Sequence, residues 1–150
     1  MSILKIALGS DHAGFELKEL IKEKLAESNN DSLDFGTHSL ESCDYPDFAA
    51  EVGRAVAAGR CHCGVIACGT GQGSAIVANK IPGVRAAVCW NEFTARMARL
   101  HNDANVLALA ARVLDGQFSL GILNVFLTTS FSEEERHSRR IDKICALERP

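Results

Sequence analysis

The sequence predicts an α/β fold, a three-layer sandwich in which a five-stranded parallel sheet carries helices on both faces. Apolar runs with the composition of strands alternate with segments of helical periodicity along the whole chain. The runs are almost wholly apolar rather than alternating, which is typical of strands buried on both faces. A helix follows each run, and such strand–helix repeats form right-handed crossovers between parallel strands.

The five predicted strands are short runs rich in valine, isoleucine, leucine and alanine. They cover residues 3–10, 32–36, 63–68, 84–90 and 105–110. The six predicted helices cover residues 14–28, 44–60, 73–81, 91–103, 114–129 and 132–148, the last of them regular over about 133–147. Pro46 follows Asp44 at a helix start, and Gly59 ends the same segment. Asn91 is a favoured N-cap residue, and Ser132 with the three glutamates after it is typical of a helix N-terminus.

The bulk composition indicates one globular domain spanning residues 1–150. The chain has 150 residues, 47% of them hydrophobic, and neither a linker nor a repeat interrupts it. Its net charge of −3 argues against nucleic-acid binding, which usually comes with a basic excess. No apolar stretch reaches the roughly 20 residues that span a bilayer, and the N-terminus does not resemble a signal peptide. We therefore expect a cytoplasmic protein that binds neither nucleic acid nor membrane.

The six cysteines do not indicate a disulfide scaffold, because such scaffolds are small secreted domains with thin cores. They stand at Cys43, Cys61, Cys63, Cys68, Cys89 and Cys145. The spacing of Cys61 and Cys63 is too short for a usual zinc pair, and no second pair follows at the right distance. We expect a reducing compartment and no metal site, and the roles of the five cysteines other than Cys68 stay open.

Asp11 and His12 follow the first predicted strand, directly before a helix. In a parallel sheet, ligands bind beyond the carboxyl ends of the strands, so these two residues are candidates for a site. Asp11 is either a helix cap or a substrate contact, and the two roles are compatible.

Cys68 ends the third strand and precedes the loop GTGQG. Gly69, Gly71 and Gly73 allow consecutive N–H groups to converge on an anion, and the next helix adds the partial positive charge of its N-terminus. That charge would also favour a reactive thiolate. The loop lacks the lysine and hydroxyl residue of the P-loop, and its alternate glycines do not fit the dinucleotide fingerprint. The alternative is an inert cysteine buried at a tight turn.

Polar and cationic side chains near the fifth strand and in the C-terminal helix complete the candidates. His101 and Asn102 stand just before that strand, where a histidine is either a surface or cap residue or a functional one. Arg112 follows the strand. Arg136 and Arg140 are four residues apart and share one helix face, and two forked guanidiniums suit a phosphate. The alternative for these arginines is a solvated basic patch that balances the preceding glutamates.

Together the segments DHAGF, CGTGQG, ANK, HNDANVLAL and RH…R resemble the type B ribose-5-phosphate isomerases, a family that includes the galactose-6-phosphate isomerase subunits. The resemblance runs from about residue 5 to residue 144, with the motifs in the family's order and spacing. It implies a Rossmann-like sandwich and an aldose–ketose isomerase of phosphorylated sugars that uses no cofactor and no metal. It also implies a homodimer, or a tetramer made of two dimers, with active sites shared between subunits.

The resemblance implies that Cys68 is the base that moves a proton between C1 and C2 of the open-chain sugar. One branch of the family has a glutamate base at the position of Ser74 instead. Asp11 and the partner's His101 resemble the groups that open the furanose ring, and Thr70 would lie beside the substrate oxygens. The implied phosphate ligands are His12, Arg112, Arg136 and Arg140, and the further substrate contacts are Asn102, Asp11, Gly69, Thr70, Gly71, Gln72, Gly73 and Ser74.

The chemistry of such a reaction explains why these residues would be needed. It requires one base of tuned pKa, amide donors that stabilise a charged oxygen, and residues that bind the phosphate. An isomerase of hexose 6-phosphates such as allose or galactose phosphate is the first alternative, because the motifs do not reveal the depth of the pocket. A non-catalytic sugar-phosphate sensor, which would not need Cys68 as a base, and a nucleotide-binding domain are the others. His137 and Arg139 receive no role and are expected to be peripheral.

Overall fold

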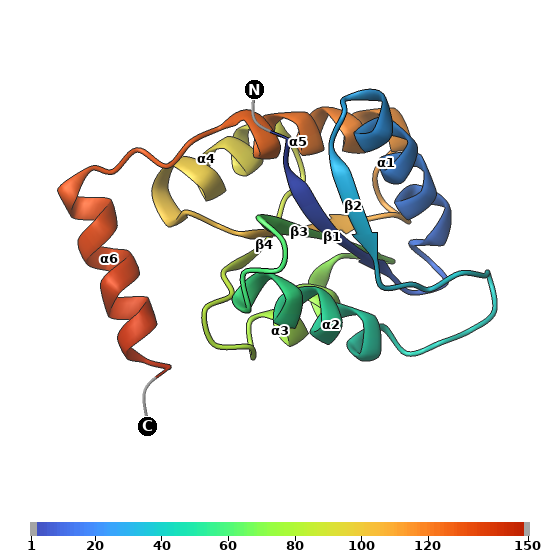
Figure 1. The fold of residues 1–150 in the computed structure, drawn as a ribbon, viewed down its shortest axis with the longest axis horizontal. Helices are drawn as coiled ribbons and strands as arrows, with labels where there is room; N and C mark the ends of the chain where they lie inside the picture. The colour runs from blue at the N-terminus through green and yellow to red at the C-terminus, as the bar shows by residue number, and fades with distance from the viewer. Residues whose placement is uncertain (1–2, 149–150) are drawn as a thin grey trace.

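The computed structural model of the chain describes residues 3–148 and is an α/β sandwich (Figure 1). Its five parallel strands lie in the order β2-β1-β3-β5-β4. The strands are β1 (Lys5–Ser10), β2 (Asp31–Asp34), β3 (Cys63–Cys68), β4 (Ala86–Val88) and β5 (Val106–Ala110). The helices are α1 (Phe15–Glu27), α2 (Tyr45–Ala57), α3 (Gln72–Ala78), α4 (Glu92–Asn102), α5 (Gly116–Thr128) and α6 (Glu135–Ala146). The predicted fold class is confirmed.

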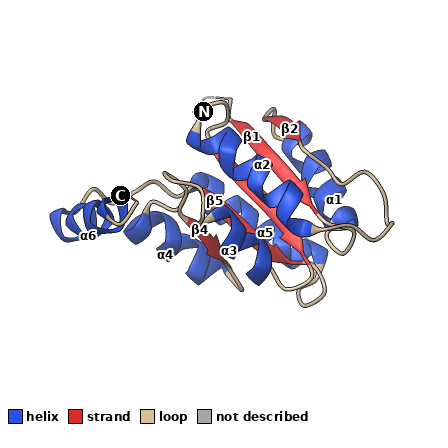
Figure 2. Cartoon of the chain, turned by 90° about the horizontal axis from the view of Figure 1, so that it is seen from below, coloured by secondary structure: helices blue, strands red, loops and turns tan. Residues whose placement is uncertain are grey.

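The helices divide between the two faces of the sheet. Helices α1, α4 and α5 lie on one face, and α2 and α3 lie on the other (Figures 1 and 2). Each face has its own apolar core, and neighbouring residues of β3 separate into the two: Val65 belongs to the core that contains Phe126, and Ile66 to the core that contains Val52. This follows from the period of two in a strand, and it explains why β3 is apolar without interruption.

Two helix starts test the local sequence signals. Asn91 caps α4 as predicted, in a capping box in which its side chain accepts the N–H of Thr94 and the side chain of Thr94 accepts the N–H of Asn91. The prediction for Ser132 was wrong, because α6 begins only at Glu135. The hydroxyl of Ser132 lies 2.8 Å from Nδ1 of His137 and so serves a side chain inside the helix.

Helix α6 lies outside the sandwich, beyond the end of α4 (Figures 1 and 2). Of its twelve residues only His137 is buried. Within residues 3–148, no helix has both the length and the apolar character that crossing a membrane requires.

The middle of the sheet contains a topological switch point. Strands β1 and β3 are neighbours, but the helices that follow them, α1 and α3, cover opposite faces. The carboxyl ends of two such strands open a crevice between their helices, and in α/β sheets this is where ligands bind.

Candidate active site

Asp11 and Cys68 leave the sheet side by side at the switch point. The strand register pairs Ser10 with Ala67, so the next residues of β1 and β3 are neighbours. Both are buried, at 7% and 4% exposed. Asp11 Oδ1 accepts the N–H of Gly14 at 3.0 Å, which holds the carboxylate at the start of α1. The N-cap of α1 is Gly14 and no side chain caps this helix, so Asp11 is not the helix cap that was considered for it.

The sulfur of Cys68 has a backbone donor aimed at it. The N–H of Gly71 lies 3.1 Å from Sγ. Gly71 has φ of +78°, a left-handed conformation that glycine adopts without the strain a side chain would add. This conformation turns the peptide N–H back toward the sulfur, where it stabilises negative charge. The sulfur of Cys68 therefore has a polar contact in addition to its packing at the end of β3.

The rest of the loop carries hydroxyls and amides. Thr70 is exposed, and its Oγ1 lies 3.4 Å from the N–H of Gln72. Ser74 is completely buried, and its hydroxyl has no hydrogen-bond partner among residues 3–148. Gly73 and Ser74 belong to the first turn of α3, whose amides have no carbonyl acceptor inside the helix. These amides are the ones that remain available for a substrate oxygen.

Cationic and donor groups stand on both sides of this loop. Arg112 donates its N–H to the carbonyl of Gly69 at 3.0 Å, and its side chain crosses Gly69, where an added Cβ would lie 3.4 Å from Cδ. On the β1 side, Nδ1 of His12 accepts the N–H of Cys43 at 3.2 Å. A neutral imidazole that accepts at Nδ1 carries its proton on Nε2, so His12 presents an N–H donor. A phosphate bound here would have donors on two sides.

Two residues of this group, Tyr45 and Cys43, were not foreseen. The ring of Tyr45 covers Gly73, where an added Cβ would lie 2.5 Å from Cζ. Cys43 lies at the end of the loop that joins β2 to α2, and Tyr45 is the first residue of α2. No spacing in the sequence links this segment to the glycines. The one available signal was Gly73 itself, since a glycine that needs no left-handed backbone implies close contact with another group.

His101 and Asn102 lie near the amino ends of the strands, whereas Cys68 lies at the carboxyl end of its strand. They end α4, which leads into the amino end of β5, whereas Cys68 pairs with Ala110 at the carboxyl end of that strand. The length of β5 alone separates the two positions by about 13 Å. One chain therefore does not bring His101 to Cys68.

Arg136 and Arg140 lie on α6 and, together with His101 and Asn102, form a second group of candidate residues at a distance from Cys68. Arg136 Nε lies 2.8 Å from Oε2 of Glu134, and both side chains are exposed. His137 and Arg139, which were expected to be peripheral to the site, differ in their burial: Arg139 is exposed and His137 is not. His137 is 3% exposed, and its ring centroid lies 4.3 Å from that of His101.

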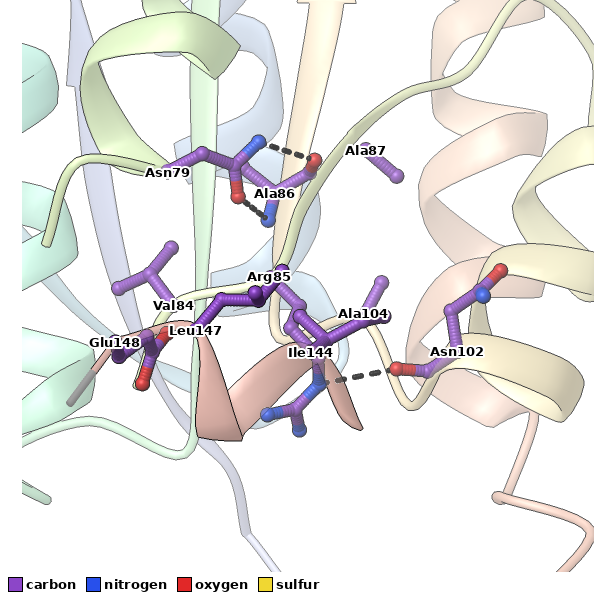
Figure 3. Close-up of a pocket in the computed structure, with 10 residues that line it drawn as sticks. All are labelled: Asn79, Val84, Arg85, Ala86, Ala87, Asn102, Ala104, Ile144, Leu147 and Glu148. Carbon is purple, nitrogen blue, oxygen red and sulfur yellow. Dashed lines mark hydrogen bonds between the residues drawn. The ribbon is translucent and has the colours of Figure 1, made fainter. Parts of the chain in front are cut away.

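A pocket of about 500 Å³ lies beside this second group, between the end of α6 and β4 (Figure 3). Asn102 is the one predicted site residue that lines it. Arg85 Nε donates to the carbonyl of Asn102 at 3.0 Å, and the amide of Asn102 points away from Arg85. The pocket does not contain Cys68 and is distinct from the crevice at the switch point.

The other cysteines differ from Cys68 in their surroundings. All six thiols, which lie within the described residues, are free. Burial raises the pKa of Cys63 to about 12 and that of Cys89 to about 11, so both thiols stay protonated at neutral pH. Among residues 3–148, no three histidine, cysteine or acidic side chains are grouped so that they could hold a metal ion.

Known proteins with this sequence and fold are isomerases of sugar phosphates. The profile of the family described as "Ribose/Galactose Isomerase" matches residues 6–144. Ribose-5-phosphate isomerase B of Escherichia coli is 43% identical over 144 residues, 96% of each chain, and a putative sugar phosphate isomerase of Rickettsia bellii is 41% identical over 96% of this chain and 99% of its own.

Solved structures agree with this result. Ribose-5-phosphate isomerase B of Clostridium thermocellum superposes with a TM-score of 0.95 at 48% identity over 97% of each chain. The type B ribose 5-phosphate isomerase of Trypanosoma brucei gives 0.94 at 44% identity, covering 98% of this chain and 100% of its own. With a sequence match over nearly the whole chain and the same sheet and helices, this protein belongs to the ribose/galactose isomerase family.

Proposed function

We propose that this protein interconverts ribose 5-phosphate and ribulose 5-phosphate through a cis-enediolate, as a single-domain cytoplasmic enzyme of the pentose phosphate pathway. The observation that carries the proposal is the Gly71 N–H aimed at the sulfur of Cys68, beside Asp11 and at the switch point of the sheet. The names of the relatives and of the solved structures support the pentose phosphate as substrate.

In the proposed reaction Cys68 acts as a thiolate base. It takes the proton from C2 of the open-chain aldose, the electron pair forms the C1–C2 double bond, and negative charge develops on the sugar oxygens. Cys68 then returns the proton to C1, and a proton moves between the two oxygens to complete the ketose. The amides at the start of α3 and the hydroxyl of Thr70 are suited to stabilise the charged oxygen, and one such donor typically lowers the barrier by about 3–4 kcal/mol. No step of this exchange needs a redox cofactor or a metal.

Ring opening must precede proton transfer, because the cyclic sugar has no carbonyl group. We assign it to Asp11 together with His101 of a second copy of the chain. The assignment is supported by the separation of His101 from Cys68 within one chain and by the position of α6 outside the sandwich. Exposed apolar side chains, among them Ile76 on α3 and Phe93 on α4, would be covered in such a homodimer, and a tetramer would pair two dimers.

The phosphate would be held from both subunits. His12 and Arg112 flank the Cys68 loop in one chain, and Arg136 and Arg140 would come from α6 of the other. Arginine forks suit phosphate oxygens, and Arg136 would exchange its exposed contact with Glu134 for the phosphate at little cost. Binding energy at the phosphate fixes the position of C1 and C2 at the thiolate.

Turnover of the purified protein on ribose 5-phosphate, allose 6-phosphate and galactose 6-phosphate, each with a chelator present, tests the substrate. Conversion of the pentose alone supports the proposal and its independence of metal. Conversion of a hexose phosphate instead would keep the mechanism and change the substrate. No turnover on any of the three contradicts an isomerase and favours a binding protein for phosphorylated sugars.

Cys68→Ala tests the base. It should reduce kcat by at least about 100-fold while ribose 5-phosphate binding, measured by calorimetry, stays largely intact. Cys89→Ala is the matched control, because Cys89 is also buried and directly follows strand β4, which β5 separates from β3. Retained turnover in Cys68→Ala would remove the cysteine from the mechanism.

A mixing experiment tests the shared site. Cys68→Ala and His101→Ala should each be nearly inactive alone. In a mixed dimer one site carries both changes and the other carries neither, so equal mixing with exchange should restore about a quarter of wild-type activity. Mixed dimers that are demonstrated but inactive would contradict the assignment of His101 to the partner.

A further inference from the structure

His137 anchors α6 to the rest of the chain. It is 3% exposed, whereas the other eleven residues of the helix are half-buried or exposed. Its ring lies against that of His101 at the end of α4, with centroids 4.3 Å apart and planes tilted by 36°. The same junction has one backbone contact, from the N–H of Ser132 to the carbonyl of Leu100 at 3.2 Å. At the other end of the segment, both carboxylate oxygens of Glu148 accept the N–H of Gly83 at 3.0 Å, so the contact between the two imidazoles is the anchor at the amino end of α6.

Ser132 links the ring of His137 to the segment before α6. The hydroxyl oxygen of Ser132 accepts the N–H of Glu134 at 3.4 Å and lies 2.8 Å from Nδ1 of His137. In a neutral ring whose Nδ1 accepts the Ser132 hydroxyl, the ring proton lies on Nε2.

The charges around the ring favour the same state. Burial lowers the pKa of His137, and the nearby cations of His101 on α4 and of Arg136 and Arg140 on α6 lower it further. Glu134, in the segment before α6, acts in the opposite direction but is outweighed. A neutral His137 ring places no positive charge beside His101.

The position of His137 also relates His101 to the arginines. At about 100° per residue, Arg136 and Arg140 lie within about 40° of each other and on the same side of His137. Because His137 faces the body of the chain, its contact sets the direction in which both guanidiniums project.

We propose that His137 is a positioning residue. Its neutral ring fixes the orientation of His101 relative to Arg136 and Arg140. The end of α4 and helix α6 then deliver the ring-opening group and the phosphate ligands together. The role of His101 in ring opening rests on the proposed function, whereas the contact between the two rings does not.

NMR of the ¹³C-histidine-labelled protein tests the contact without using activity. In His137→Asn the Cε1–H signal of His101 should move, because it loses the ring current of its neighbour. In His101→Ala the titration midpoint of His137 should rise, because a neighbouring cation is removed. Arg139→Ala, an exposed change on the same helix, is the control and should move neither signal. An unmoved His101 signal in His137→Asn overturns the proposal whether or not the enzyme turns over.

Kinetics test the consequence. His137→Ala should lower kcat/KM for ribose 5-phosphate, which must open its ring, by about 10- to 100-fold more than for an open-chain tetrose phosphate. His137→Asn should recover part of this loss, since its side-chain carbonyl accepts the Ser132 hydroxyl as Nδ1 does. Equal losses on the two substrates overturn the proposal. If His101→Ala itself does not discriminate between them, the ring-opening assignment fails, and the NMR result still decides whether His137 orients His101.

Discussion

Replacing Lys18 by methionine should lower the free energy of unfolding by about 2–3 kcal/mol. The side chain of Lys18 is 1% exposed, and its Nζ lies 2.6 Å from Oδ2 of Asp34 and 2.6 Å from Oε1 of Glu19. Oδ1 of Asp34 accepts the N–H of Gly36 at 2.9 Å, and Gly36 in turn accepts the N–H of Ser10 at 2.6 Å. The ion pair therefore supports the backbone directly before Asp11.

The expected loss of stability follows from the contacts that Asp34 retains when Lys18 is replaced. Removing one partner of a buried ion pair costs about 3–5 kcal/mol, because the remaining charge is left without compensation. Asp34 is 11% exposed and retains Lys22 at 3.0 Å, so the cost should lie at or just below the lower end of that range, at about 2–3 kcal/mol. For a chain of this size the loss corresponds to a Tm lowered by roughly 4–12 °C.

Urea unfolding at pH 7 and one fixed protein concentration measures the effect. Lys22→Met is the matched control: it removes a contact to the same carboxylate, but Lys22 is 44% exposed, so the change should cost less than about 1 kcal/mol. Combining Lys18→Met with Asp34→Asn should cost at least about 1 kcal/mol less than the two single changes together. Strict additivity, or equal effects of the two lysine changes, would refute the reasoning.

Three further outcomes are expected. Burial raises the pKa of Asp34, but hydrogen bonds from two lysines and a backbone amide outweigh it and hold the pKa below its usual value of about 4. The stabilisation from Asp34 is thus present above pH 4 and lost as pH falls through the lowered pKa, so wild type and Asp34→Asn should converge in stability in acid denaturation series. Gly14→Ala should destabilise by about 3 kcal/mol or prevent folding, because its Cβ would lie 2.0 Å from the carbonyl oxygen of Ala67; near-wild-type thermal stability would contradict the packing of α1 on β3. Asn91→Ala should cost about 1 kcal/mol in urea unfolding by removing the capping box of α4, and no loss would mean that water replaces the cap.

The alternation of apolar runs and helical segments was enough to predict every strand and helix in the order observed. Boundaries were less accurate where tertiary contacts decide them. The predicted strand 84–90 is reduced to Ala86–Val88, because β4 is an edge strand that pairs with β5 alone. The helix expected from Ser132 starts three residues later, because a histidine within the helix uses the hydroxyl that was expected to cap it.

The candidate site, like the fold, could be predicted from the sequence only in part. The rule that ligands bind at the carboxyl ends of parallel strands singled out Asp11 and Cys68 separately, and the register of β1 and β3 brings the two together. The contact of Tyr45 with Gly73 and the burial of His137 against His101 could not be predicted. Both join segments far apart in the chain through side chains whose periodicity indicates nothing about a partner.

The separation of the two groups has a chemical consequence. Under the proposed function, the group around Cys68 supplies the base, the amide donors and the carboxylate of Asp11, which accepts the N–H of Gly14. The group around His101 holds an imidazole and two arginines, but no thiolate. Neither group alone contains what ring opening, proton transfer and phosphate binding together require. Under the proposed function, activity therefore requires two associated chains. Each residue that fixes the direction of α6 in one chain then acts on the site around Cys68 of the other chain.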